Sequence, residues 1–184
     1  MLKVKPKKCR QCGKMFTPTY STTQITCDYT CAITYGIAKK VEKDNKEWAK
    51  EKKERKEAIM SHSEWLKILQ AVFNTYIRER DKGLECVSCG CKVDKGHASH
   101  MFSVGSHPNM RFNEDNVHLS CIECNLHRHG FLIGYMLRLP DRIGKERFDK
   151  LIEDSKKTVL KLSIPEIKEM IQKYKLLTKQ LKDV

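Results

Sequence analysis

The sequence has no long hydrophobic run. None of its apolar stretches approaches the ~18 consecutive residues that cross a bilayer, so we expect a soluble protein with no membrane contact. The first twelve residues, MLKVKPKKCRQC, also lack the apolar h-region of a secretory signal peptide. Disulfide bonds are typical of secreted proteins, so the nine cysteines are better explained as metal ligands in a reducing cytoplasm.

Apolar side chains are modest in number. Hydrophobic residues make up 40% of the sequence and aromatic residues 8%, against 32% charged residues. A chain of 184 residues is long enough for one ordinary domain or two small ones, but this composition argues against one large core. The sequence therefore favours small modules that a metal helps to stabilise.

Acidic residues are outnumbered, and the excess of positive charge lies at the two ends of the chain. The formal net charge is +13. Residues 1–40 hold eight basic and one acidic residue, and residues 131–184 hold thirteen basic and eight acidic residues, whereas residues 86–130 are neutral. We expect the basic flanks to contact the phosphates of DNA and the neutral centre to act on it.

Two cysteine pairs in the neutral centre have metal-binding spacing. The pairs are typical of a tetrahedral four-cysteine zinc site, and Cys91 or His97 is an alternative for one ligand. The predicted ligands are Cys86, Cys89, Cys121 and Cys124. The segment between the pairs is rich in histidine, and imidazole accepts protons near neutral pH. Residues 86–130 are therefore the predicted chemical centre.

Residues 1–40 contain two further cysteine pairs and are predicted to form a separate zinc module. Its expected ligands are Cys9, Cys12, Cys27 and Cys31. Fewer than ~40 residues cannot bury enough core to fold unaided, so the metal would supply the stability. Basic residues surround the first pair and favour DNA docking over a purely structural role. These are Lys5, Lys7, Lys8, Arg10 and Lys14.

The rest of the chain is predicted to be largely helical. Residues 41–60 are almost entirely charged and should form a helical spacer. Residues 61–135 form the predicted catalytic domain, which opens with a capping box at Ser61 and Glu64. Residues 136–184 form a basic helical region with a second capping box at Ser163. The last helix has three possible roles. Its apolar stripe could pack against the domain and close it, the stripe could form a dimer interface, or the helix could lie along a DNA duplex as a basic arm.

Within the centre, the pattern predicts a β-hairpin followed by a helix. The strands are expected at residues 93–100 and 116–119, and the helix is expected to begin near Cys121. Asn125 and His129 would then share one helical face at i and i+4. A divalent ion could lie between the first strand and this face.

The order His100, Asn116, Cys-x2-Cys-Asn125 resembles the HNH (ββα-metal) endonuclease fold. That resemblance implies an α+β protein with a small zinc-bound, treble-clef-like ββα core. It also implies that His100 is the general base, that Asn116 holds the loop, and that Asn125 binds a catalytic Mg²⁺ or Mn²⁺ ion. His129 or His127 would complete this metal site.

One residue departs from the HNH pattern. Enzymes of this kind generally have Asp or His immediately before the base as a second metal ligand, and this chain has Ser99. The alternatives are that Asn125 and the downstream histidines suffice, that His97 or Asp94 takes the place, or that activity is weak. Ser99 also favours a different class of function, in which a non-catalytic zinc-finger protein binds DNA as a recombination mediator.

A closer resemblance covers most of the chain. The runs GHASH, RFNEDNVHLSC and CN, together with the N-terminal cysteines, resemble the NinG (Rap) recombination proteins of lambdoid phages. This resemblance implies an endonuclease for branched recombination intermediates such as D-loops and Holliday junctions, in the cytoplasm of the bacterial host. Branched or duplex DNA is the implied partner, with a homodimer and phage recombination proteins as further candidates.

Overall fold

The structure is a computed structural model that describes residues 5–157 and 159–183. The fold is mixed α+β, mostly helical, with two small two-stranded sheets. The chain divides after Met60 into two compact units, which are described one by one. Within the described residues, no helix is both long and apolar enough to cross a membrane.

The first unit consists of a short hairpin and a long helix. Strands β1 (Lys7–Lys8) and β2 (Met15–Phe16) pair antiparallel, and helix α1 runs over Tyr29–Ile59. Asp28 caps α1, because its side chain accepts a hydrogen bond from the Cys31 N–H at 2.7 Å. The predicted limit at residue 40 falls inside this one continuous helix.

Helix α1 buries none of its residues. Between Glu42 and Glu57, basic and Glu side chains pair at i and i+4, as in Lys46 with Glu42 and Arg55 with Glu51. Such pairs stabilise a helix by only a few tenths of a kcal/mol each, but several occur in series here. Local pairing, and not a core, therefore supports the charged part of α1.

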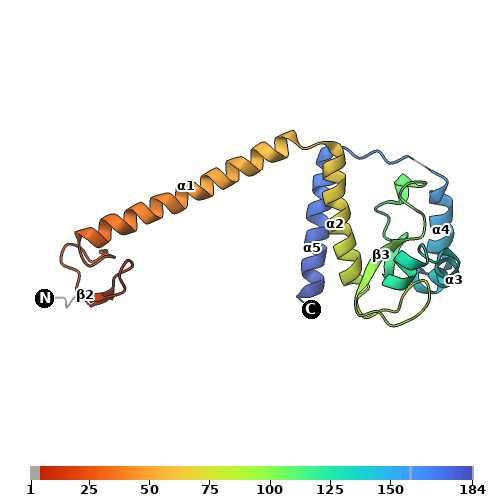
Figure 1. Cartoon of the computed structure of the whole chain (residues 1–184), viewed down its shortest axis with the longest axis horizontal. Coiled ribbons are helices and arrows are strands. Elements are labelled where there is room, and N and C mark those ends of the chain that lie inside the picture. Colours follow the sequence, from red (N-terminus) through yellow and green to blue (C-terminus); the bar gives the residue numbers. More distant parts are fainter. Residues whose placement is uncertain (1–4, 158, 184) are drawn as a thin grey trace. The chain divides into compact units, whose positions relative to one another are not determined.

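The second unit is layered, with a hairpin packed between two pairs of helices (Figure 1). Helices α2 (His62–Arg80) and α5 (Ile164–Lys182) lie side by side and form one outer layer. Helices α3 (Leu132–Ile143) and α4 (Lys145–Ser155) pack together on the other side. Both predicted capping boxes, at Ser61 with Glu64 and at Ser163 with Glu166, are confirmed.

The α2–α5 layer has an apolar and aromatic interface. The Phe73 ring meets Tyr174 edge-on at 4.9 Å between centroids, and Tyr76 lies 5.0 Å from Tyr174. Ile167 and Ile171 of α5 are also buried. The last helix therefore closes its own domain, and its buried stripe is not available as the alternative dimer seam.

The hairpin joins β3 (Gly96–His100) to β4 (Val117–Cys121) in antiparallel register, with His97 opposite Ser120 and His100 opposite Val117. The connecting loop contains a short 3-10 turn, η1 (Pro108–Met110). Asn109 in this turn donates from Nδ2 to the Asp154 carbonyl of α4 at 2.8 Å. The loop is therefore tied to the helices beneath it.

A second core fills the space between the hairpin and α3–α4. Tyr135 is at its centre, fully buried, and donates its hydroxyl to the Ser99 carbonyl at 3.0 Å. The buried side chains of this core are Val87, Met101, Met110, Tyr135, Leu139, Ile143 and Leu151. The predicted limit at residue 135 falls within α3, because α3 belongs to the same core as the hairpin.

The expectation of a regular helix from Cys121 onward is wrong. A five-residue π-helical turn, η2 (Glu123–His127), follows β4 instead, and it closes when the Gly130 N–H bonds to the Cys124 carbonyl at 2.8 Å. His129 has a φ of 50°, so it lies outside any helix and not on the helical face of Asn125. The turn breaks here because Gly130 and Phe131 also have positive φ, which redirects the chain into α3.

Candidate functional site

The N-terminal unit gathers four cysteine sulfurs. Cys9, Cys12, Cys27 and Cys31 all lie within 4.8 Å of one another. Cys27 Sγ is 3.6 Å from Cys12 Sγ and 3.5 Å from Cys31 Sγ. A tetrahedron with Zn–S bonds of ~2.3 Å has S–S edges of ~3.8 Å, so one metal ion of this size fits the four thiols.

The first cysteine pair lies on a tight backbone turn. The Gly13 N–H donates to the Cys9 carbonyl at 3.0 Å, and Gly13 has the positive φ of 76° that such a turn requires. The central unit repeats this turn, since the Gly90 N–H donates to the Cys86 carbonyl at 2.9 Å. Both turns point their thiols toward one place and so prepare a metal site.

The central group differs from the predicted ligand set by one member. The four sulfurs within 4.8 Å of one another belong to Cys86, Cys89, Cys91 and Cys121. Cys91 joins them because the chain turns back after Gly90, which brings its sulfur 3.4 Å from Cys89 Sγ. Cys124 is buried in η2, and its N–H donates to Cys121 Sγ at 3.4 Å. Five cysteines thus surround the site: the sulfur of Cys91 lies within the group of four, and the thiol of Cys124 lies beside those of Cys89 and Cys121.

Cys86 is prepared as a thiolate. Burial would raise its pKa, but hydrogen bonds from Ser120 Oγ and the Cys121 N–H outweigh burial and lower the pKa to about 6. Because only the thiolate binds zinc strongly, these bonds favour a metal in this group.

The central cysteine turn is fixed against α3 by a close backbone approach. A Cβ atom at Gly134 would stand 2.2 Å from the Ser88 carbonyl oxygen, so only glycine fits there. Ser88 Oγ also donates to the Gly130 carbonyl at 3.0 Å. The central cysteine group, η2 and α3 therefore form one connected support for the residues around them.

His100 stands at the end of β3 with a defined orientation. Its Nε2 lies 3.0 Å from the Arg111 carbonyl oxygen, which can only accept, so Nε2 carries the proton. The neutral ring then has no proton on Nδ1. Burial lowers the pKa of His100 below its usual value, so the neutral form prevails at pH 7.

Asn116 is completely buried and holds the loop between the strands. Its Oδ1 accepts from the Phe102 N–H at 2.7 Å. Its Nδ2 donates to the carbonyls of Phe102 and Met110, both at 3.0 Å. These three bonds join the start and the end of the loop, so Asn116 orders the segment that contains Arg111 and thereby orients His100.

His97, not a downstream histidine, lies next to Asn125. Asn125 Nδ2 is 3.0 Å from His97 Nδ1 across the gap between β3 and η2. His127 and His129 are exposed, and no contact with Asn125 joins either of them within the described residues. Asp94 is exposed too. Of His97, Asp94, His127 and His129, His97 is therefore the residue that the structure places beside Asn125.

Ser99 faces the interior. It is 3% exposed and pairs in register with His118, which lies against Tyr135 of α3. A carboxylate at this position would be buried without a cation partner, which is costly. The absence of Asp at Ser99 therefore matches the local packing.

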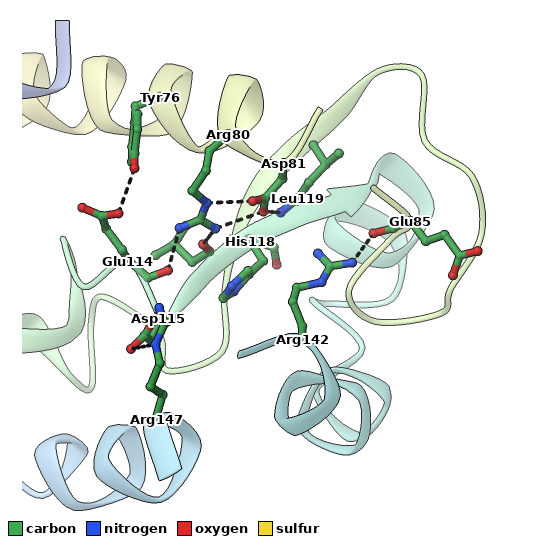
Figure 2. Close-up of polar contacts among 12 residues, drawn as sticks. Tyr76, Arg80, Asp81, Glu85, Glu114, Asp115, His118, Leu119, Arg142 and Arg147 are labelled. Carbon is green, nitrogen blue, oxygen red and sulfur yellow. Dashed lines mark hydrogen bonds and ion pairs between the residues drawn. The ribbon is translucent and has the colours of Figure 1, made fainter. Parts of the chain in front are cut away.

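The end of α2 clamps the free edge of β4 (Figure 2). Arg80 Nε donates to Asp81 Oδ1 at 2.7 Å, and Asp81 Oδ2 accepts from the Leu119 N–H at 2.8 Å. Arg80 also donates to the Val117 carbonyl at 2.8 Å. Sequence reasoning missed this pair, although two adjacent opposite charges at the end of an apolar stripe are a visible signal.

The basic residues predicted to dock DNA lie on the N-terminal hairpin and its turn. Lys5, Lys8, Arg10 and Lys14 are exposed, whereas Lys7 is half-buried and donates to the Thr22 carbonyl. Four of the five side chains are therefore accessible to a polyanion, and Lys7 has a structural bond.

Comparison with known proteins assigns the family. The family model described as "Bacteriophage Lambda NinG protein" matches residues 1–183. The NinG proteins of Escherichia phage 933W and Enterobacteria phage H19B are 32% and 33% identical over 170 residues, and each alignment covers 82% of this chain and 82% of the relative. The NinG protein of Escherichia phage lambda is 41% identical over 98 residues, which cover 53% of this chain and 48% of that protein. No solved structure matches the chain. The chain belongs to the NinG family of bacteriophage proteins.

Proposed function

We propose that the protein is a divalent-metal-dependent endonuclease of the HNH type, acting on branched DNA during phage recombination. The observation that carries the proposal is the geometry of the β3–β4 hairpin, which orients the neutral His100 on one face of β3 and places His97 beside Asn125 on the other. Two cysteine groups of zinc-binding size support the hairpin and the N-terminal unit.

The proposed general base is His100. Its Nε2–H bond to the Arg111 carbonyl leaves Nδ1 as the atom that accepts a proton from water. The resulting hydroxide attacks the phosphorus in line with the leaving oxygen. Burial favours the neutral ring, which is the form that a base requires.

The proposed catalytic metal ligands are His97 and Asn125. His97 would supply an imidazole nitrogen, and Asn125 would supply its amide oxygen after the amide group rotates. These two ligands suit Mn²⁺ or Mg²⁺, and water and phosphate oxygens would occupy the other coordination positions. A divalent ion held there would neutralise charge that develops on the phosphate oxygens. The hydrogen bond from the Cys124 N–H to Cys121 Sγ supports the position of Asn125, which is the next residue in η2.

The proposed substrate follows from charge and from the resemblance to the NinG (Rap) recombination proteins. The net charges of +7 and +5 on the flanks suit a long polyanion. The preference for D-loops and Holliday junctions, and any phage recombination protein as a partner, rest on that resemblance.

A non-catalytic DNA-binding mediator is the second candidate. It is favoured by the sparse donor set, because among the described residues the groups of three or more Cys, His, Asp or Glu that could hold a metal ion are the two cysteine groups. A site with one histidine and one amide is a weak anchor for a catalytic ion.

The two candidates differ in a cleavage assay. A labelled four-way junction and a linear duplex of the same sequence would be incubated with the zinc-loaded protein, with and without Mg²⁺ or Mn²⁺. The endonuclease proposal expects metal-dependent nicks in the junction in preference to the duplex. Binding of both substrates without any nick, in either metal, would favour the mediator.

A further inference from the structure

A cavity of about 280 Å³ lies where the end of α2, strand β4 and the helices α3 and α4 meet (Figure 2). Six polar side chains line it: Arg80, Asp81, Glu114, His118, Arg142 and Arg147. These residues are distinct from His97, His100 and Asn125, so the cavity is separate from the proposed cleavage site.

The carboxylates in and around the cavity already have partners. Asp81 is paired with Arg80 at 2.7 Å, and Asp115, next to Glu114, is paired with Arg147. Glu114 accepts from the hydroxyl of Tyr76 at 2.9 Å and from that of Tyr174 at 3.3 Å. The negative charges are thus bound to other groups, and two of the three arginines are neutralised.

Arg142 is the exception among the three arginines. Its Nη2 donates to the backbone carbonyl of Glu85 at 2.6 Å, while its Nη1 is buried without a hydrogen-bond partner. No ion pair joins Arg142 to a carboxylate in residues 5–157 and 159–183. A buried guanidinium donor without an acceptor is unfavourable, so the site is incomplete as it stands.

The environment of His118 reports the sign of the potential in the cavity. Burial, and then the positive charge of Arg80, lower the pKa of His118 to about 3, with Arg142 and Arg147 acting in the same direction and Asp81 opposing them. The arginines therefore outweigh the carboxylates at the wall of the cavity.

We propose that this cavity binds a phosphate group through Arg142, with Arg147, which keeps its ion pair with Asp115, as a second and weaker contact. A guanidinium presents paired N–H donors that match phosphate oxygens, and a phosphate would supply the acceptor that Arg142 Nη1 lacks. A neighbouring cavity of about 390 Å³ shares Leu84 and Arg142 and is also lined by Asp141 and by Arg138, which is paired with Glu85. The phosphate belongs either to a nucleic-acid strand or to a free phosphate or monoester, and both offer the same oxygens.

The first test uses inorganic phosphate as the probe. Thermal unfolding of the zinc-loaded protein is measured in sodium phosphate and in sodium chloride of equal ionic strength. Phosphate should raise the Tm of the wild type and of Lys150→Gln, an exposed control on α4, but not that of Arg142→Gln. Arg147→Gln, whose ion pair with Asp115 is largely exposed, gives a second variant should Arg142→Gln fail to fold. An equal rise in all variants, or no rise in the wild type, would overturn the proposal.

The second test separates the two sources of phosphate. Binding of a labelled duplex is measured over a range of salt concentrations without added divalent cation. If the cavity holds a backbone phosphate, Arg142→Gln should weaken binding by about tenfold and reduce the slope of log K against log[salt] by ~0.9. An unchanged slope, with the phosphate-dependent Tm shift lost, would assign a free phosphate or monoester. Both tests measure binding, so they can fail or succeed independently of DNA cleavage.

Discussion

His97 and Ser99 are two residues apart on one strand, so their side chains share a face of the hairpin. His97 is near the strand's open end, where it contacts Asn125 at 3.0 Å. Ser99 is deeper, where Tyr135 and His118 fill the space. Ser99 is the buried residue of β3, so of these two residues only His97 could reach a metal ion.

A metal role for this pair predicts selective loss of cleavage. His97→Ala and Asn125→Ala should each raise the Mg²⁺ or Mn²⁺ concentration needed for half-maximal nicking by about 10–100-fold, because each removes one of two protein ligands. Ser99→Ala, matched as a small change on the same strand, should not. Metal titrations of the nicking rate measure this. If both His97→Ala and Asn125→Ala kept the metal dependence of the wild type, the catalytic ion would have to be assigned to other residues.

His118 predicts how stability changes with pH. Its folded-state pKa is about 3, whereas an unfolded histidine titrates near 6.5. Below pH 6.5 the unfolded chain therefore binds one more proton at this site than the folded chain does. The free energy of unfolding consequently decreases as the pH is lowered. From pH 7.5 to 5.5 the wild type should lose about 1.4 kcal/mol more than His118→Gln. Urea unfolding at both pH values, with zinc in excess, gives the difference, and equal losses would show that His118 can protonate in the folded state.

The sequence predicted which residues are special better than how they are grouped. The hydrogen bonds of Asn116 to the loop agree with what the resemblance to the HNH fold implies, and the strand that ends at His100 agrees with the spacing. The pairing of Asn125 with His97 joins residues 28 positions apart. It depends on the direction of η2, which no local pattern in the sequence specifies.

At the scale of elements, the end of α2 sets the position of the hairpin. Asp81 is 3% exposed and connects Arg80 to the Leu119 N–H, so a charged pair replaces a third strand at the edge of β4. The hydroxyls of Tyr76 and Tyr174 reach Glu114 just before β4 begins. The α2–α5 layer thereby holds both the strand and the loop that precedes it.

Removal of this clamp should be costly. Asp81→Ala leaves a half-buried Arg80 without its carboxylate and a buried Leu119 N–H without its acceptor, so we expect a loss of about 3 kcal/mol in unfolding free energy. Glu85→Ala is the matched control, since its ion pair with Arg138 is exposed and should contribute at most about 1 kcal/mol. Urea denaturation measures both. Equal effects would mean that the clamp adds nothing beyond a surface pair.

The elements that sequence predicted well have strong local causes. The capping boxes at Ser61 and Ser163 and the apolar stripes of α2 and α5 depend on residues three and four apart. The helix after Cys121 was mispredicted because cysteine spacing suggests a helical start, while three consecutive positive φ values after Arg128 depend on packing against Ser88. Tertiary contacts, and not the local sequence pattern, therefore determine the backbone conformation after Cys121.

At the scale of the whole molecule, each of the two units contains one cysteine group, but the units differ in how many apolar side chains they bury. The first unit has almost no buried apolar side chain, since its buried apolar residues in the described part of the chain are Cys9 and Pro18. The second has two layers of core. We therefore expect the first unit to depend on a bound metal more strongly than the second.

The metal content tests this division. The purified protein should contain two zinc ions per chain, and a chromogenic chelator should unfold the N-terminal unit before the central one. Cys91→Ser should release the central zinc faster than Cys124→Ser, because the Cys91 sulfur is within the group of four. Zinc analysis and chelator kinetics measure both. Faster release of zinc from Cys124→Ser than from Cys91→Ser would assign Cys124 as the fourth ligand. A content of one zinc ion per chain would show that one of the two cysteine groups does not bind zinc.

The central claim is that a half-buried, neutral His100 activates water for DNA cleavage. The most direct measurement is the single-turnover nicking rate of a labelled four-way junction by the wild type and His100→Ala, at several pH values with Mg²⁺ or Mn²⁺. The account predicts a rate that stays on its plateau to below pH 6.5, because the pKa of His100 is lowered, and a loss of at least ~100-fold in His100→Ala with zinc content and DNA binding retained. Nicking by His100→Ala at the wild-type rate, or a folded zinc-loaded wild type that binds the junction and never cuts it, would contradict the account.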